Sequence, residues 1–332
     1  MASSPIIAVI GSLNVDLVSR VKRIPAAGET LTASSFDIGS GGKGANQAVA
    51  CARLSQRRQE DGAPPRKVAG MQVRMIGAVG QDQFAGGLLE GLERDGVDVG
   101  GVRRLEGQKT GVSVIVVEED SGENRIMFSP NANYAFSGEE SLVPEDASVV
   151  LFQLEFPLEA VLHNIKQAKS KGIQVILNPA PAVLLPDEAY RGLDHLIMNE
   201  TEAAILSGRD PASVDVETDW TSVASDFLDR GVKNVVITLG AQGVFYQTAA
   251  RRTSSLPGKR AAARKVESVV DTTAAGDTFV GAYAVQVANP AKRSYSFRGF
   301  DIDDAIGFAV GAAAVTVQRM GAQSSIPWLD EL

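Results

Sequence analysis

The sequence predicts an α/β fold, in which a doubly wound, mostly parallel sheet is flanked by helices and carries a small β-sheet lid. Three observations lead to this class. Short β-branched runs recur along the chain, amphipathic segments of helical period separate several of them, and two regions hold strands with no helix between them. Alternating strands and helices are typical of parallel sheets joined by crossover helices.

The expected strands of the large sheet are almost continuously apolar, as in strands that are buried on both faces. They cover residues 6–10, 73–79, 149–154, 173–178, 196–199 and 235–239. Apolar residues at helical spacing predict helices over residues 84–94, 158–170 and 220–230.

The lid is expected from three further strands, at residues 31–38, 110–117 and 125–128. We expect one domain over residues 1–332, with the lid built from about residues 15–40 and 100–130. Residues 56–67 contain Arg and Pro pairs, which predict a solvated surface insertion. The basic residues of the segment 251–265 are expected on exposed hairpin turns.

Composition narrows the classes of function. The chain of 332 residues is 44% hydrophobic, which is ample for a substantial core. Its formal charge of −8 disfavours a nucleic-acid-binding surface, because such a surface needs clustered cations. Cys51 is the single cysteine, and His163 and His195 are far apart, so we expect neither a disulfide nor a thiolate or histidine metal site.

No secretory signal is recognised at the N-terminus. The longest apolar stretches, such as residues 308–317, are shorter than the roughly 20 residues that span a bilayer. We therefore expect a soluble protein of the cytoplasm, with the nucleus left open as a second location. The expected partner is a small molecule, with no membrane or nucleic acid.

The segment VVDTTAAGDTF, at residues 269–279, holds the densest group of candidate catalytic residues. We expect its two valines to end a strand and a buried helix to begin near Ala275. The first amides of a helix lack intrahelical acceptors and attract anions, and Gly276 lets an anion approach because it has no side chain. Asp277 is then either a general base beside a bound phosphoryl group or a simple helix cap.

Five motifs in a fixed order give the whole chain a resemblance to a known family. They are GSLNVD at 11–16, GSGGKGANQA at 39–48, NETE at 199–202, TLGAQG at 238–243 and DTTAAGDTF at 271–279. They resemble the ribokinase family of sugar kinases, also called the phosphofructokinase B family. The resemblance implies ATP-dependent conversion of D-ribose to D-ribose 5-phosphate, with Asp277 as base and the amides of Ala275 and Gly276 as an anion hole.

The resemblance also implies a sugar site around the first two motifs. Asn14 and Asp16 follow the first strand, where doubly wound sheets bind ligands, although a turn stabilised by Asn and Asp is the alternative. By resemblance, the remaining sugar contacts come from Gly42, Lys43, Asn46, Glu155 and Asp277.

Residues 39–44 also satisfy the pattern G-x-G-x-x-G of dinucleotide-binding loops. We do not expect a dinucleotide site, because the acidic residue at the end of a second strand is absent. A Walker A loop is not expected either, since Gly44 stands where that motif has Ser or Thr.

The nucleotide is implied to bind at the third and fourth motifs and at Gly276. Asn199 and Glu202 are spaced to face one cleft, and Glu202 suits Mg²⁺, held through water, whereas a plain capping box is the alternative. Thr238, Gly240 and Gly243 are implied to contact ATP, whereas a tight hairpin is the alternative reading of these glycines.

A monovalent cation, usually K⁺, is implied beside the anion hole. By resemblance, its ligands are Asp271 and Thr273, with backbone carbonyls at Thr316, Arg319, Gly321 and Ser325. Hard oxygen ligands suit such an ion. The alternative is that Asp271 only anchors its own loop through hydrogen bonds.

Some features depart from the family pattern. The insertion at residues 56–67 and the segment 288–303 are long, and Val310 stands where relatives often carry a polar residue near adenine. The family also implies a homodimer through the lid. Three alternative functions remain: a kinase for another small sugar or nucleoside, a catalytically silent sugar sensor, and a nicotinamide dehydrogenase. The dehydrogenase is disfavoured because the acidic residue that dinucleotide-binding folds carry after their second strand is absent.

Overall fold

The structure is a computed structural model that describes all residues except 1–3, 59–65, 68–69, 120–122, 215–217 and 290–299. The strands of its large sheet are β1 (Ile6–Ile10), β6 (Gln72–Gly80), β7 (Val97–Leu105), β10 (Val149–Phe152), β11 (Gln174–Leu177), β12 (His195–Asn199), β13 (Asn234–Thr238), β14 (Val244–Thr248) and β15 (Lys259–Ala261). Its helices are α1 (Lys43–Leu54), α2 (Ala85–Arg94), α3 (Leu158–Ser170), α4 (Asp187–Tyr190), α5 (Glu200–Leu206), α6 (Trp220–Asp229), α7 (Ala249–Thr253), α8 (Ala275–Ala288) and α10 (Ile302–Thr316). Short 3-10 turns cover Asn131–Tyr134, Pro211–Ser213, Gly240–Gln242, Gln323–Ser325 and Leu329–Glu331.

The described strands form a nine-stranded central sheet in the order β15-β14-β13-β12-β11-β10-β1-β6-β7. All pairings from β13 to β7 are parallel. β14 and β15 add two antiparallel strands at one edge. The predicted mostly parallel sheet is therefore confirmed.

Alternate residues of the strands bury against helices on opposite faces of this sheet. Ile7 and Val9 of β1 pack in one apolar cluster with α1, α2, α8 and α10. Ala8 and Ile10 pack in a second cluster with α3, α5 and α6. Each fully buried Ile or Val contributes roughly 1.5–3 kcal/mol, so a strand buried on both faces needs the continuous apolar runs seen in the sequence. None of the helices in the described part of the chain has the length and apolarity needed to cross a membrane.

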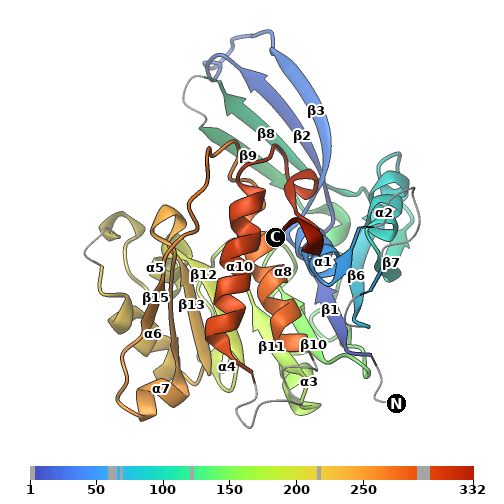
Figure 1. The fold of residues 1–332 in the computed structure, drawn as a ribbon. Coiled ribbons are helices and arrows are strands. Elements are labelled where there is room, and N and C mark those ends of the chain that lie inside the picture. The colour runs from blue at the N-terminus through green and yellow to red at the C-terminus, as the bar shows by residue number, and fades with distance from the viewer. Residues whose placement is uncertain (1–3, 59–65, 68–69, 120–122, 215–217, 290–299) are drawn as a thin grey trace.

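A second sheet of four strands projects from the carboxyl end of β1 (Figure 1). It consists of β3 (Ser35–Gly41), β2 (Asn14–Val21), β8 (Gly111–Glu118) and β9 (Asn124–Ser129), in that order. The expected small sheet is present. Its strand predicted at residues 31–38 begins later, as β3, and it contains one strand, β2, that was not predicted. Residues 100–105 lie in β7 of the large sheet.

The expectation of a strand ending at Val269 and Val270 is wrong. Both side chains are largely exposed. The backbone amide of Val270 donates to the carbonyl of Val317, just beyond α10, at 2.8 Å, so this segment docks on a helix end instead of a sheet edge. The predicted start of a buried helix at Ala275 is confirmed by α8.

Two long segments noted in the sequence lie partly outside the described residues. Of the insertion at residues 56–67, the described ends form β4 (Gln56–Arg57) and β5 (Arg66–Lys67), which pair antiparallel. Gln56 is buried, so the solvated insertion begins only after it. The segment 288–303 falls mostly on residues 290–299, outside the described part.

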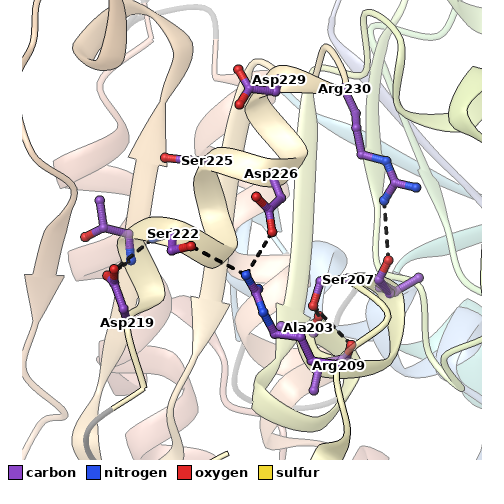
Figure 2. Close-up of polar contacts among 12 residues, drawn as sticks. Ala203, Ser207, Arg209, Asp219, Ser222, Ser225, Asp226, Asp229 and Arg230 are labelled. Carbon is purple, nitrogen blue, oxygen red and sulfur yellow. Dashed lines mark hydrogen bonds and ion pairs between the residues drawn. The ribbon is translucent and has the colours of Figure 1, made fainter.

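The helix that follows β12 is held by a set of polar contacts to its neighbour α6 (Figure 2). Arg209, just after α5, donates to Asp226 at 2.9 Å, and Arg230 donates to the carbonyl of Leu206 at 3.3 Å. Asp219 caps α6 by accepting from two backbone amides of its first turn. α5 carries two of the candidate nucleotide-binding residues at its start, so these contacts fix the helix from its other end.

Candidate active site

A cavity of about 220 Å³ opens at the carboxyl ends of β11, β12 and β13, beside the start of α8. Its lining includes Lys43, Asn178, Asn199, Glu202, Thr238, Thr272, Gly276 and Asp277. A larger cleft of about 1940 Å³ lies between the small sheet and the large body, and Asp16 and Asp271 line it. The candidate residues of four motifs therefore gather at one edge of the sheet, as expected for a doubly wound fold.

Asp277 lies in the first turn of α8 and is buried. Its Oδ2 accepts from Asn46 Nδ2 at 2.9 Å, and its Oδ1 accepts from Gln47 Nε2 at 3.0 Å. The carboxylate points into the protein and caps no amide in the described contacts, so the simple-cap alternative is not supported. It is a hydrogen-bonded acceptor at the wall of a cavity.

The backbone before Asp277 leaves open space for a ligand. Ala274 has a left-handed φ of 58°, which turns the chain into the helix. A Cβ added at Gly276 would meet no heavy atom within 4 Å. The amide of Ala275 donates to the carbonyl of Thr272 at 3.3 Å, whereas the amide of Gly276 has no acceptor in the described contacts and lies where an anion can approach.

The start of α1 is pressed against the end of β1 by two glycines. Gly42 has a φ of 89°, and a Cβ there would lie 2.8 Å from the backbone nitrogen of Asn14. A Cβ at Gly44 would lie 2.6 Å from the backbone nitrogen of Ser12. Only glycine fits this close approach, which joins the first and second motifs into one structure.

Lys43 brings a cation to this edge. Burial alone would lower the pKa of its ammonium group, but the nearby carboxylates of Asp277, Glu155 and Glu202 outweigh burial and hold the pKa above its usual value. Lys43 is therefore charged, and it is placed among three anionic groups that a phosphorylated ligand would join.

Glu155 follows β10 and is fixed by three donors on one oxygen. Its Oε2 accepts from Ser12 Oγ at 2.7 Å, from the backbone nitrogen of Lys43 at 3.1 Å and from Asn14 Nδ2 at 3.2 Å. These contacts come from both motifs and leave Oε1 for another donor. A sugar hydroxyl is a suitable one.

Asp16 lies on β2 and is buried. Burial is the main cause that raises the pKa of its carboxyl to about 6; the charges of Glu155 and Asp277 act in the same direction, and a hydrogen bond with Ser113 opposes the shift. A Cβ at Gly41 would lie 2.0 Å from Asp16 Oδ2, so the neighbouring strand passes close over the carboxylate. The structure thus brings Asn14, Asp16 and Glu155 together, which a simple turn would not require.

The third motif, at residues 199–202, forms a capping box, and the fourth, at residues 238–243, forms a tight hairpin turn, which were the alternatives to nucleotide contacts. Asn199 and Glu202 form a capping box at the start of α5, with both reciprocal hydrogen bonds at 2.8 Å. Burial raises the pKa of Glu202, and its Oε1 is not used in the box. Gly240 and Gly243 make the tight turn between β13 and β14, and Thr238 lines the cavity.

The expected cation ligands divide into two groups. Asp271 accepts from the backbone nitrogens of Thr273 and Gly321, both at 2.9 Å. Thr316, Arg319 and Ser325 make their described contacts elsewhere. The carbonyl of Thr316 accepts from the amide of Arg319 at 3.0 Å, and the Ser325 hydroxyl donates to Ala322. Asp271 does anchor its loop, and its carboxylate and the expected backbone carbonyls are oxygen ligands of the kind that suit K⁺.

Comparison with known proteins agrees with the gathering of these motifs. The model of the pfkB family carbohydrate kinases matches residues 5–329. The chain belongs to this family. The predicted family and the prediction of a sugar kinase are therefore confirmed.

Individual relatives of this pfkB-family kinase cover nearly its full length. It is 41% identical to a ribokinase of Schizosaccharomyces pombe over 98% of this chain and 96% of that protein. It is 36% identical to a deoxyribokinase of Salmonella typhi, over 98% and 96% of the two chains. The structure of Arabidopsis thaliana ribokinase complexed with ribose and ATP superposes with a TM-score of 0.81 at 28% identity, covering 99% and 97%.

Three polar residues of this pfkB-family kinase were not singled out from the sequence. Ser12 and Gln47 lie inside the first two motifs, and their position next to expected ligands was the only signal. Asn133, in the turn Asn131–Tyr134, accepts from the backbone nitrogen of Leu13 at 2.9 Å and donates to Asn14 Oδ1 at 2.7 Å. It lies 119 positions from Asn14, so no local pattern could reveal this contact.

Proposed function

We propose that the protein transfers the γ-phosphoryl group of ATP to the 5-hydroxyl of D-ribose, giving D-ribose 5-phosphate and ADP. The observation that carries this proposal is the buried carboxylate of Asp277 at the open N-terminus of α8. The 41% identity to a ribokinase supports ribose as the sugar. The similarity to a structure that holds ribose and ATP supports both substrates.

In this mechanism Asp277 takes the proton of the sugar hydroxyl as the oxygen attacks the γ-phosphorus. A new oxygen–phosphorus bond forms, and the bond between the γ-phosphorus and the bridging oxygen of ADP breaks. The amides of Ala275 and Gly276 stabilise the charge on the transferred group. Positioning by these groups supplies most of the rate, and the base adds about 10²–10⁴-fold.

The sugar is held on the side of the small sheet. Asp16 and Glu155 Oε1 accept sugar hydroxyls, while Lys43 and Asn46 donate or supply charge. Asn14 and Gly42 complete the floor of this site. The small sheet acts as a lid, since its strand β2 carries Asp16 over the sugar and closure excludes water, which competes as an acceptor.

The nucleotide is held on the side of β12 and β13. Asn199, Thr238, Gly240 and Gly243 lie along its path to Gly276. Glu202 fits Mg²⁺ held through water, because the capping box leaves Oε1 of this carboxylate unused. When bound, Mg²⁺ neutralises charge on the phosphates.

A monovalent cation such as K⁺ fits the loop of Asp271. The carboxylate of Asp271 and the oxygens of Thr273, Gly321 and the segment around Ser325 are hard donors. When bound, K⁺ supplies positive charge beside the start of α8. Asp271, which already accepts from the amides of Thr273 and Gly321, would be one of the residues that hold the ion.

A coupled assay of ADP release with ribose, with and without K⁺, tests the proposal. The parent protein is expected to turn over, with a higher rate in K⁺. Asp277→Asn is expected to lose about 10²–10⁴-fold in kcat while calorimetry shows that ribose binding is kept. Asp219→Asn, which changes a helix-capping aspartate away from the cavity, serves as the control and keeps the parent rate. A parent rate in Asp277→Asn would refute the role of the base.

Other substrates and a silent protein are outcomes of the same assay. The 36% identity to a deoxyribokinase makes 2-deoxy-D-ribose the second candidate substrate. Comparing kcat/KM for ribose, 2-deoxyribose, fructose and adenosine decides among them. Ribose binding without ADP release would identify a sugar sensor instead of a kinase.

We also propose that two copies associate through the small sheet. Phe36, Ile38, Ile126 and Met127 on this sheet are each more than half exposed, which is unusual for large apolar side chains. Sedimentation is expected to give a dimer for the parent and a monomer for Ile38→Asp. A monomeric parent at micromolar concentration would contradict the proposal.

A further inference from the structure

A row of buried amide side chains lies behind Asp277. Gln47, on α1, donates through Nε2 to Asp277 Oδ1 and to Asn178 Oδ1, both at 3.0 Å. Its Oε1 accepts from Gln153 Nε2 at 2.6 Å. Gln47 is fully buried and therefore uses both amide protons and its oxygen in contacts with three side chains.

The row has a fixed direction because it ends on a backbone carbonyl. Asn178 Nδ2 donates to the carbonyl of Ile197 in β12 at 3.0 Å, and a carbonyl can only accept. The Oδ1 of Asn178 then faces Gln47, so Gln47 must donate to it through Nε2. If the Gln47 amide were rotated by half a turn, its oxygen would face two other acceptors, Asp277 Oδ1 and Asn178 Oδ1. Its nitrogen would face the donor Gln153 Nε2, so all three hydrogen bonds would be lost.

The two donors to Asp277 differ in their freedom. Asn46 also belongs to the expected sugar contacts, and its Oδ1 is buried without a described partner, so this side chain can exchange its contacts when a sugar enters. Gln47 is held on all sides by Gln153 and Asn178. It is therefore the more firmly held of the two donors.

We propose that Gln47 is a positioning residue that keeps Asp277 charged and in one orientation while the sugar hydroxyl binds. This role rests on the proposed function of Asp277 as the base. The charged groups that interact with Asp277 are Lys43 on α1, Asp16 on β2 and Glu202 on α5. Two of these three are carboxylates, so the neutral donors Asn46 and Gln47 and the cation Lys43 are the described groups that favour a carboxylate at this position.

The test compares two variants. Gln47→Met removes the amide group that donates to Asp277 and Asn178 and keeps a similar side-chain volume. Asn164→Leu removes a buried amide on α3, far from the cavity. Asn164 is a matched control because it is equally buried and satisfies backbone groups of its own, Leu142 N at 2.7 Å and Ala160 O at 2.8 Å. Loss of a hydrogen bond to a charged group is expected to lower kcat of Gln47→Met by about 10–100-fold. The KM for ribose is expected to stay within about threefold of the parent.

The pH profile separates positioning from loss of stability. In Gln47→Met the acidic limb of the kcat profile is expected to move to higher pH, because the charged carboxylate has lost a donor. Asn164→Leu is expected to lower the melting temperature and leave the limb in place. An unmoved limb in Gln47→Met, or a loss of kcat that matches that of Asn164→Leu, would overturn the proposal.

A second variant and a second readout cover the other outcomes. Gln47→Glu keeps the volume and sets a carboxyl against Asp277, so it is expected to move the limb further in the same direction; no movement would also overturn the proposal. The carboxyl ¹³C signal of Asp277, assigned by its loss in Asp277→Asn, is expected to change its chemical shift in Gln47→Met without any turnover, because one oxygen has lost its donor. Turnover of the parent tests the proposed function, whereas the difference between parent and variant tests Gln47.

Discussion

Replacing Asp16 by Asn is expected to stabilise the protein at neutral pH while it weakens sugar binding. Folding raises the pKa of Asp16 from 3.8 to about 6, mainly through burial. The folded state therefore binds this proton more tightly than the unfolded state does, so stability falls as pH rises between about 4 and 6. Above that window the charged carboxylate costs about 3 kcal/mol, from about two pKa units at 1.36 kcal/mol each.

Asn removes this cost and can keep the hydrogen bond with Ser113. Urea unfolding followed by circular dichroism is expected to show Asp16→Asn more stable than the parent by about 3 kcal/mol at pH 8 and about 1 kcal/mol at pH 4.5. Asp37→Asn, at an exposed carboxylate on β3, is the control and should stay within about 0.5 kcal/mol of the parent. An equal difference at both pH values, or a loss of stability at pH 8, would refute the reasoning.

Three further predictions concern the scaffold of the site. Gly42→Ala is expected to lower the free energy of unfolding in urea by about 2 kcal/mol or more, because the new Cβ would lie 2.8 Å from the backbone nitrogen of Asn14. Gly86→Ala on α2 is the control and should not destabilise the protein, because a Cβ there would meet no heavy atom within 4 Å. Arg53→Met should cost about 3–5 kcal/mol by removing the ion-pair partner of buried Asp95 and the donor to the carbonyls of Gln323 and Ile326. Adding Asp95→Leu should recover part of the loss in melting temperature, because it removes the buried carboxylate but not the two carbonyls. Burial lowers the pKa of His195 to about 4, so the contribution of His195 to stability should fall by about 3 kcal/mol as pH drops from 6.5 to 4. The difference in unfolding free energy between the parent and His195→Gln should change by this amount, because the opposing titration of Asp16 is common to both proteins.

Elements with one apolar and one polar face could be predicted from the sequence. The helix expected over residues 158–170 has these same bounds in α3, because its buried positions recur at helical spacing. α1 was not predicted, since ten of its twelve residues are buried and no polar face marks its period. β7 was not predicted because Gly100 and Gly101 interrupt its apolar alternation.

Site residues could be predicted where their chemistry is local. The open helix start beside Asp277 follows from the sequence around α8, and the capping box at Asn199, which was the alternative to a magnesium site, follows from its spacing to Glu202. The partners of Asp277 could not be predicted. Gln47 lies 230 positions away in the chain, and a pattern within either segment contains no information about which side chains meet after folding.

The placement of the base relative to the sugar site depends on one helix pair. Asp277 and Gly281 lie four residues apart on α8 and so share a face, and this face meets α1. A Cβ at Gly281 would lie 2.5 Å from the Cβ of Ala50 and 3.0 Å from the carbonyl oxygen of Gln47, so the two helices are in close contact one turn from the base.

The hydrogen bond from Gln47 to Asp277 thus continues a packed seam between α1 and α8. α1 starts at Gly42, which is itself pressed against the backbone of Asn14. Sugar ligands, base and phosphate-facing amides are therefore joined through two close backbone contacts at glycines instead of through flexible loops. Phosphoryl transfer depends on positioning, so this rigid connection explains why small residues recur in both signatures although the signatures lie more than 200 residues apart.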